Sequence, residues 1–316
     1  MQDGRGETDH ALLERAIAEI VDDAASATER GEPDARSGEI DASRFGIAVA
    51  TADGHFCAGG DAERSFPIQS ISKVFSLTLA LEAIDEALWD RVGREPSGDP
   101  FNSIIDLERH AGIPRNPFIN AGALVVADVL LSAPRPDDGD PPEPVRRRLA
   151  QRVGSMPDLD KAVLASLDEG YANRALANLA KSFGNLEHSV QAVMELYVRQ
   201  CAVLLDCRRL ALAGLPLAQA QAKGAPSDQQ ARRRAKRINA LMLTCGQYDG
   251  SGEFAYRVGM PAKSGVSGAI LAVSPKRASI AVWSPGLDEN GNSVLGVRAL
   301  ERLAETMDWS VFGSLR

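Results

Sequence analysis

Residues 66–77 have the sequence FPIQSISKVFSL, which places a serine and a lysine three positions apart, at Ser70 and Lys73. Side chains at this spacing lie on one face of a helix, so the lysine ammonium group can reach the serine hydroxyl. A serine hydroxyl is a weak nucleophile unless a neighbouring base takes its proton. A lysine is such a base only where burial or a nearby cation lowers its pKa. The mostly apolar residues 74–81 favour this burial and predict a buried helix.

The spacing alone is also compatible with a serine that caps a helix and a solvated lysine one turn later. Two features of the setting favour a catalytic role instead. Pro67 precedes the expected helix, and the helix that follows is too apolar for a protein surface. Ser70 then lies near a helix N-terminus, where developing negative charge is stabilised.

The composition is that of an ordinary soluble globular protein and excludes several classes. The chain has 316 residues, enough for one large domain or two small ones, and a net charge of -8, which disfavours nucleic acid or an anionic membrane as a partner. The basic cluster at residues 232–237 fits a solvated helix face, with an anion or partner site as the alternative. The four cysteines lack the spacing of a disulfide framework or a zinc site. The polar N-terminus and the absence of a long apolar run lead us to expect a cytoplasmic protein.

Strand-like segments lie near both ends of the chain, and helical patterns fill the middle. Residues 45–50 and 55–59 predict one hairpin, and residues 270–273 and 278–283 predict another, so we expect these strands to meet in one antiparallel sheet. A final helix is expected at about residues 294–307. The predicted fold is α+β, with a central antiparallel sheet flanked by helices and an inserted helical lobe. We expect residues 1–316 to form a single catalytic unit, with a sheet lobe from about 40–65 plus 255–316 and a helical lobe at about 66–250.

Ser-x-x-Lys is also the nucleophile motif of β-lactamases and penicillin-binding proteins. Further segments of the chain occur in the same order as in the serine-dependent glutaminases. The chain therefore resembles this family, which shares the β-lactamase-like fold. The matching segments are QSISK (69–73), GREPSG (93–98), NPFINAGA (116–123), KSFGN (181–185), CGQYD (245–249), GMPAKSGVSG (259–268) and VWSP (282–285). Together these segments are highly specific, although any one of them alone is not.

The resemblance implies hydrolysis of L-glutamine to L-glutamate and ammonia through an acyl-enzyme on Ser70. Lys73 would take the serine proton, and the Tyr248 phenol would relay a proton to the departing ammonia. The backbone N–H groups of Ser70 and Val266 would form the oxyanion hole. The lysine of the segment Lys263-Ser264-Gly265 would add positive potential that keeps Lys73 neutral.

The resemblance also implies that the substrate is bound by Ser70, Asn120, Asn173, Tyr197, Tyr248 and Val266. Amide and phenol groups suit the head group of an amino acid. No metal and no organic cofactor are implied, and the family suggests a homodimer or homotetramer.

Each assignment has a structural alternative. Tyr248 could fill space after the helix that ends near Cys245, and Asn120 could be a helix cap within the turn that begins at Asn116. Tyr197 could be an ordinary core residue, and Lys263 could lie at a strand edge.

The chain departs from the family pattern in two places. It has no tyrosine before Tyr171, although the family has one upstream of its first strand. Ser166 stands where the family places a glutamate for the substrate α-amino group, and Asp168 or Glu169 are the nearby substitutes. Two other functions therefore remain open: a catalytically weakened relative that binds an amino acid or a partner, and another serine amidase or β-lactamase-like acyl-transfer enzyme.

Overall fold

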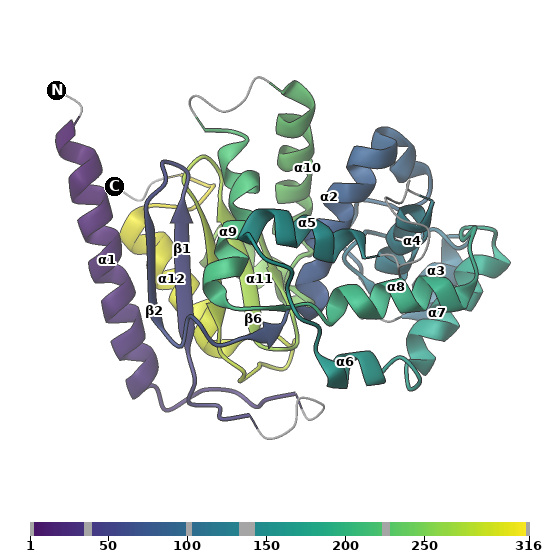
Figure 1. The fold of residues 1–316 in the computed structure, drawn as a ribbon, viewed down its shortest axis with the longest axis horizontal. Coiled ribbons are helices and arrows are strands. Elements are labelled where there is room, and N and C mark those ends of the chain that lie inside the picture. Colours follow the sequence, from purple (N-terminus) through teal and green to yellow (C-terminus); the bar gives the residue numbers. More distant parts are fainter. Residues whose placement is uncertain (1–2, 35–39, 99–102, 133–142, 223–227, 314–316) are drawn as a thin grey trace. The chain divides into compact units, whose positions relative to one another are not determined.

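Figure 1 shows the computed structural model, which describes residues 3–34, 40–98, 103–132, 143–222 and 228–313. The chain forms two compact units. The first, here called the sheet unit, consists of residues 1–66 and 205–316, and the second, the helical unit, consists of residues 67–204. Among the described residues, no helix combines the length and the low polarity that a bilayer-spanning segment needs.

The sheet unit is built on five antiparallel strands in the order β2–β1–β7–β6–β5. These strands are β1 (Gly46–Thr51), β2 (Phe56–Gly60), β5 (Ala262–Ser264), β6 (Ala269–Ser274) and β7 (Ala278–Trp283). The N-terminal hairpin joins the C-terminal one through β1 and β7, where Ile47 lies opposite Val282. Both predicted hairpins are confirmed, and so is their union in one antiparallel sheet of an α+β fold.

Every residue of β1, β6 and β7 is buried, which shows that both faces of the sheet are covered. Helices pack against each face. On one face, Ile280 and Val282 share a core with α1 (Asp3–Ser26) and α12 (Val294–Met307), the purple and yellow helices of Figure 1. On the other face, Ser279 packs against Gly214 of α9 (Cys207–Gln219), where a Cβ atom at residue 214 would come 2.5 Å from the Ser279 hydroxyl. A glycine therefore allows α9 to approach the sheet closely.

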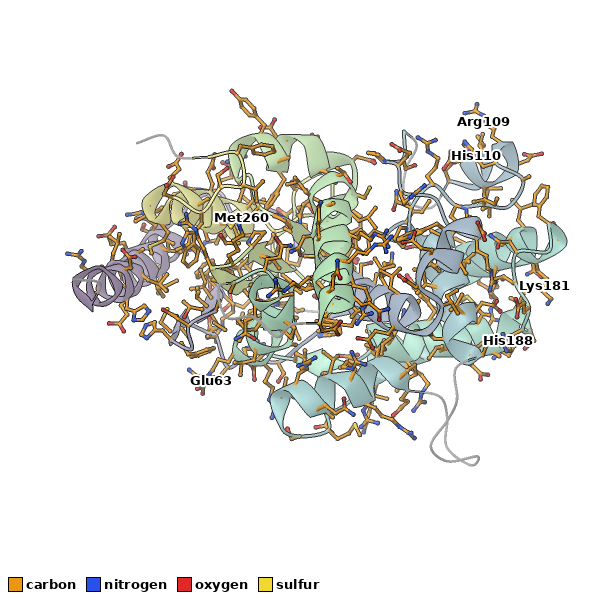
Figure 2. The ribbon with its side chains drawn as sticks, turned by 90° about the horizontal axis from the view of Figure 1, so that it is seen from above. Glu63, Arg109, His110, Lys181, His188 and Met260 are labelled. Carbon is orange, nitrogen blue, oxygen red and sulfur yellow. The ribbon has the colours of Figure 1, made fainter. Side chains whose placement is uncertain are left out.

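The rest of the sheet unit consists of α10 (Gln229–Cys245), the short 3-10 helix η4 (Tyr248–Gly250) and α11 (Ser251–Arg257). Because α9 to α11 group with the sheet, the helical unit is shorter than the helical lobe predicted at about residues 66–250. Met260 between α11 and β5 is fully buried in the core of the sheet unit and is labelled in Figure 2. The single catalytic unit over residues 1–316 stays a prediction.

At the centre of the helical unit lies α4 (Asn120–Leu131), an almost wholly buried helix that packs against α2, α7 and α8. The other elements of this unit are η2 (Gln69–Ile71), α2 (Ser72–Ile84), η3 (Asp85–Asp90), α3 (Ile104–Arg109), α5 (Pro144–Val153), α6 (Lys161–Ala165), α7 (Tyr171–Ser182) and α8 (Val190–Cys201). The two-residue strands β3 (Phe66–Pro67) and β4 (Leu204–Leu205) pair with each other.

The segment at residues 116–123 begins with a turn, and α4 begins four residues later, at Asn120. Pro117 disfavours the helical conformation at residue 116. The Asn116 carboxamide oxygen instead accepts hydrogen bonds from the N–H groups of Phe118 and Ile119, which closes a turn before the helix.

Candidate active site

Ser70 lies in the 3-10 turn η2, immediately before α2, and its side chain is half-buried. The preceding residue, Gln69, has a φ of 47°, a conformation that non-glycine residues rarely adopt. The turn is anchored because the Ile68 N–H donates to the Val203 carbonyl. In the described part of the chain, the Ser70 hydroxyl makes no hydrogen bond, and the Ser70 N–H has no backbone acceptor. Both groups are therefore available to a substrate.

Lys73 occupies the first turn of α2 and is only 1% exposed. Burial lowers the pKa of its ammonium group to about 8, against a smaller opposing effect of Cys201. Its Nζ atom donates to the Phe118 carbonyl at 3.0 Å and to Asn120 Oδ1 at 2.7 Å. The predicted burial of this lysine is confirmed, and its hydrogen bonds are to α4 and the turn before it rather than to Ser70.

Asn120 joins the other predicted residues of the helical unit. Its Nδ2 donates to Asn173 Oδ1 at 3.0 Å, and its Oδ1 accepts from the Tyr197 hydroxyl at 3.3 Å as well as from Lys73. The Lys73 ammonium also lies 5.9 Å from the centre of the Tyr197 ring. Four of the residues singled out from the sequence therefore form one hydrogen-bonded cluster, which we call the Asn120 cluster: Lys73, Asn120, Asn173 and Tyr197.

These contacts address two of the alternatives. Asn120 is the first residue of α4 and its side chain does not cap the helix, so the capping alternative is wrong. Tyr197 is buried, as a core residue would be, but its hydroxyl has a polar partner within the cluster. The Phe118 carbonyl, which accepts from Lys73, was missed in the sequence, although it lies in the quoted NPFINAGA segment.

In the sheet unit, Tyr248 and Lys263 contact each other. The Lys263 ammonium lies 4.3 Å from the centre of the Tyr248 ring, within the range of a cation–π interaction. Its Nζ donates to the Ser264 carbonyl at 2.7 Å, and the Tyr248 hydroxyl donates to the same oxygen at 3.4 Å. Lys263 lies on the edge strand β5 but is fully buried, so it is not a solvated edge lysine. Tyr248 has a φ of 52°, an uncommon backbone conformation for a non-glycine residue that Gln69, next to Ser70, also adopts.

Val266 lies in the turn between β5 and β6. The Gly265 N–H bonds the Ala269 carbonyl, and the Trp283 Nε1 of β7 donates to the Ser267 carbonyl at 2.9 Å. Within the described residues, the Val266 N–H donates no hydrogen bond. A rigid turn with an unused N–H is the arrangement that an oxyanion-binding group needs.

The positions considered for a carboxylate partner of the substrate lie at the surface of the helical unit. Ser166 is exposed and its hydroxyl donates to the Val163 carbonyl, while Asp168 and Glu169 are exposed in the loop before α7. No contact of these side chains with Asn120, Asn173 or Tyr197 occurs among the described residues. The sequence-based suggestion that Asp168 or Glu169 replaces the missing glutamate stays untested.

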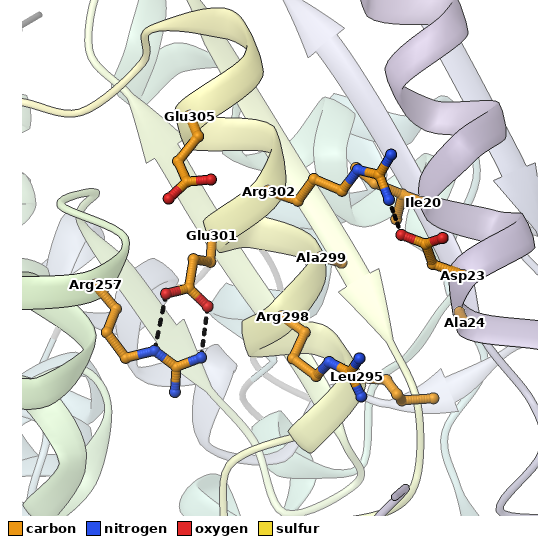
Figure 3. A pocket seen from close by; sticks show the side chains of 10 residues that line it. All are labelled: Ile20, Asp23, Ala24, Arg257, Leu295, Arg298, Ala299, Glu301, Arg302 and Glu305. Carbon is orange, nitrogen blue, oxygen red and sulfur yellow. Dashed lines mark hydrogen bonds and ion pairs between the residues drawn. The ribbon is translucent and has the colours of Figure 1, made fainter. Parts of the chain in front are cut away.

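A surface cavity of about 510 Å³ between α1 and α12 carries many charges, but most of them are paired (Figure 3). Arg257 binds Glu301 through two nitrogens, and Arg302 binds Asp23. Over the described residues, no group of three or more histidine, cysteine or carboxylate side chains is arranged to hold a metal ion. The basic segment 232–237 lies within α10, as expected for a helix.

Comparison with known proteins gives a consistent family. The family model described as Glutaminase matches residues 38–312. A curated glutaminase of Rhodopseudomonas palustris (strain BisB5) is 52% identical over 307 residues, which cover 96% of this chain and 98% of that protein. A glutaminase of Mesorhizobium japonicum is 50% identical, with 95% of this chain and 96% of that protein covered.

Solved structures agree with these sequence matches. The probable glutaminase ybaS superposes with a TM-score of 0.86 at 33% identity, covering 96% of this chain and 98% of its own. The Bacillus subtilis glutaminase YbgJ, in covalent complex with 5-oxo-L-norleucine, superposes with a TM-score of 0.78 at 33% identity, covering 96% and 99%. The mixed fold, with helices flanking an antiparallel sheet, is the β-lactamase-like fold of bacterial glutaminases.

Proposed function

This chain belongs to the glutaminase family, whose members hydrolyse the side-chain amide of glutamine, and we propose that it does so through a covalent acyl-enzyme on Ser70. The observation that carries this proposal is the Asn120 cluster. It links the buried amine of Lys73, with its pKa of about 8, to Asn173 and Tyr197 through one carboxamide. A proton acceptor and amino-acid-binding groups are thus organised together, three residues from an available serine.

In the proposed reaction, neutral Lys73 accepts the Ser70 proton and Ser70 Oγ attacks the amide carbon of L-glutamine. The N–H groups of Ser70 and Val266 stabilise the oxyanion of the tetrahedral intermediate. The C–N bond then breaks, and the departing amine receives a proton through Tyr248 and leaves as ammonia. Water hydrolyses the ester on Ser70, releases L-glutamate and returns the proton to the serine.

The buried lysine suits the role of the base. A pKa of about 8 leaves roughly one lysine in ten neutral at pH 7, whereas an unperturbed lysine would be almost wholly protonated. Lys263, whose Nζ atom lies over the Tyr248 ring, matches the lysine of the Lys-Ser-Gly segment in the family resemblance and is assigned the role of adding positive potential. Asn120, Asn173 and Tyr197 are assigned to binding the amino-acid head group.

The test is ammonia release from L-glutamine by the purified chain, by Ser70→Ala and by the control Ser76→Ala. Ser76 lies on α2, one turn beyond Lys73, and its hydroxyl donates to the Lys73 carbonyl, so its removal changes a buried serine without changing the nucleophile. We expect activity that disappears only in Ser70→Ala. Incubation with 6-diazo-5-oxo-L-norleucine, which reacts with the Bacillus protein, should label Ser70 in the unchanged chain.

One observation supports a second candidate, a weakened relative that binds an amino acid. Ser166, Asp168 and Glu169 are exposed, and within the described residues none of them hydrogen-bonds to the Asn120 cluster, so none of these three positions supplies a carboxylate partner for the substrate ammonium. If folded protein binds L-glutamine but releases no ammonia, this second function replaces the first. Turnover of a β-lactam such as nitrocefin without glutamine hydrolysis would instead indicate a β-lactamase-like enzyme.

We also propose L-glutamine as the small-molecule partner, with a homodimer or homotetramer as the assembly and the cytoplasm as the location. None of the four cysteines is in a disulfide, which suits a reducing compartment. Sedimentation at several concentrations and cell fractionation test the last two points.

A further inference from the structure

We propose that Asp128 is a positioning residue, which sets the geometry of Asn173 and Tyr197 by fixing the turn between the helices that carry them. This inference rests on the proposed function, because it assumes that Asn173 and Tyr197 bind the substrate. Asp128 itself touches none of the residues of the Asn120 cluster among the contacts of the described residues.

The Asp128 carboxylate is completely buried and accepts hydrogen bonds from several sources. Its oxygens accept from Arg91 Nη2 at 2.6 Å, from the Glu187 N–H at 3.0 Å, and from the His188 N–H and Nδ1 at 2.8 and 3.0 Å. Burial opposes ionisation, but these donors hold the pKa of Asp128 below its usual value. The charge is therefore retained inside the protein and directed at one short segment.

That segment, residues 185–188, connects α7 to α8 and is held on its other side as well. Arg91 also donates to the Asn185 carbonyl, and Asn185 Nδ2 donates back to the Arg91 carbonyl. Lys181, in the last turn of α7, donates to the carbonyls of Leu186 and Glu187. Figure 2 shows Lys181 and His188 at the same end of this part of the molecule.

The position of Asp128 on α4 explains why this turn bears on the site. Asn120 begins α4, and Asp128 follows eight residues later, about 12 Å along the helix. The helices α7 and α8 are therefore joined to α4 at two points: by Asn173 and Tyr197 at its start, and by their connecting turn at Asp128. With the second point released, the register of the two helices along α4 depends on apolar packing and on the neutral hydrogen bonds to Asn120.

The experiment compares the steady-state kinetics of Asp128→Asn with those of the unchanged chain and of Glu82→Gln. The control removes the ion pair in which two nitrogens of Arg148 donate to Glu82, and within the described residues neither side chain hydrogen-bonds to residues 185–188. In Asp128→Asn an NH₂ group replaces one acceptor, so at least one donor loses its partner. We expect KM for L-glutamine to rise about tenfold, the effect of weakening one or two hydrogen bonds to the substrate, with kcat changed much less.

A purely structural role would lower the melting temperature and the fraction of active enzyme but leave KM unchanged, and this result in folded protein would overturn the proposal. Arg91→Gln, at a half-buried position, covers the case in which Asp128→Asn fails to fold, and its KM should rise in the same direction. Hydrogen exchange at the Glu187 and His188 amides gives a readout without catalysis and should accelerate in both variants. Loss of Ser70-dependent ammonia release from the unchanged chain would instead defeat the proposed function, so the two failures are distinguishable.

Discussion

Lys73 Nζ lies 2.7 Å from Asn120 Oδ1, and the same oxygen accepts a hydrogen bond from the Tyr197 hydroxyl. One carboxamide thus contacts both the proposed base and a proposed substrate-binding residue. Replacing any member of this cluster should therefore alter proton transfer and substrate binding together, in proportions that depend on which hydrogen bond is lost.

The pH dependence of activity should follow the titration of Lys73. Because the base must be neutral and its pKa is about 8, kcat/KM should rise with pH and level off above about pH 8 to 9. A pH–rate profile measured at constant ionic strength checks this. A rate that falls between pH 7 and 8.5 would contradict the assignment of Lys73 as the base.

Asn120→Asp places a carboxylate beside Lys73. An opposite charge at this distance stabilises the ammonium form, so the pKa of Lys73 and the rising limb of the pH–rate profile should move up by about 1 to 3 pH units. The control Asn178→Asp adds the same charge on the exposed face of α7, where the side chain bonds only the Arg174 carbonyl. It should leave the profile in place, and an equal shift in both variants would refute the local explanation.

Tyr197→Phe removes the hydroxyl that bonds Asn120 but retains the ring near Lys73. Since the hydroxyl is assigned to substrate binding, loss of one hydrogen bond of about 1 kcal/mol to L-glutamine should raise KM about fivefold, and loss of the bond to Asn120 should lower the melting temperature slightly. Tyr171→Phe is the matched control, since Tyr171 is 76% exposed on α7. Equal kinetics for the two variants would remove Tyr197 from the site.

Gly122→Ala should destabilise the helical unit. A Cβ atom at residue 122 would lie 2.0 Å from the Asn116 carbonyl oxygen, so the turn that starts α4 must shift. We expect a loss of about 1 to 3 kcal/mol in the free energy of unfolding, measured by denaturant titration. Gly252→Ala meets nothing within 4 Å in α11 and should be neutral or slightly stabilising.

Burial of Lys73 also predicts how stability changes with pH. Its pKa is lowered in the folded state from 10.5 to about 8, so between these values the unfolded chain binds more protons. The destabilising effect, roughly 3 kcal/mol, is fully present below pH 8 and disappears as the pH approaches 10.5. Stability of the unchanged chain should therefore rise relative to that of Lys73→Met across this window, and parallel curves would show that Lys73 is not buried.

Local patterns in the sequence were sufficient to predict much of the fold. The alternation of apolar strands with turn residues located both hairpins, and α12 has the bounds expected from its periodicity. The grouping of α9 to α11 with the sheet was not foreseen. It depends on which face of the sheet α9 covers, and the helical pattern of residues 207–219 does not contain that information.

The sequence likewise predicted some residues of the site and missed others. Lys73 was chosen through its spacing from Ser70, and Asn120, Asn173 and Tyr197 through family resemblance. The structure brings these four residues together. Asp128 was missed because it lies within an apolar helix and its partners, the Arg91 and His188 side chains and the N–H groups of Glu187 and His188, are 37 to 60 residues away. No local motif in a single sequence joins positions so far apart.

The carboxamide of Asn120 has a final consequence, which concerns thermodynamic linkage. Its oxygen accepts a hydrogen bond from Lys73, and its NH₂ group donates one to Asn173. A glutamine molecule that competes for either bond would change the proton affinity of the Lys73 amine. Linkage is reciprocal, so deprotonation of the amine must change the affinity for glutamine by the same factor. Under the proposed assignment of Asn120 to substrate binding, glutamine binding would therefore change the protonation of Lys73 before any covalent bond is formed.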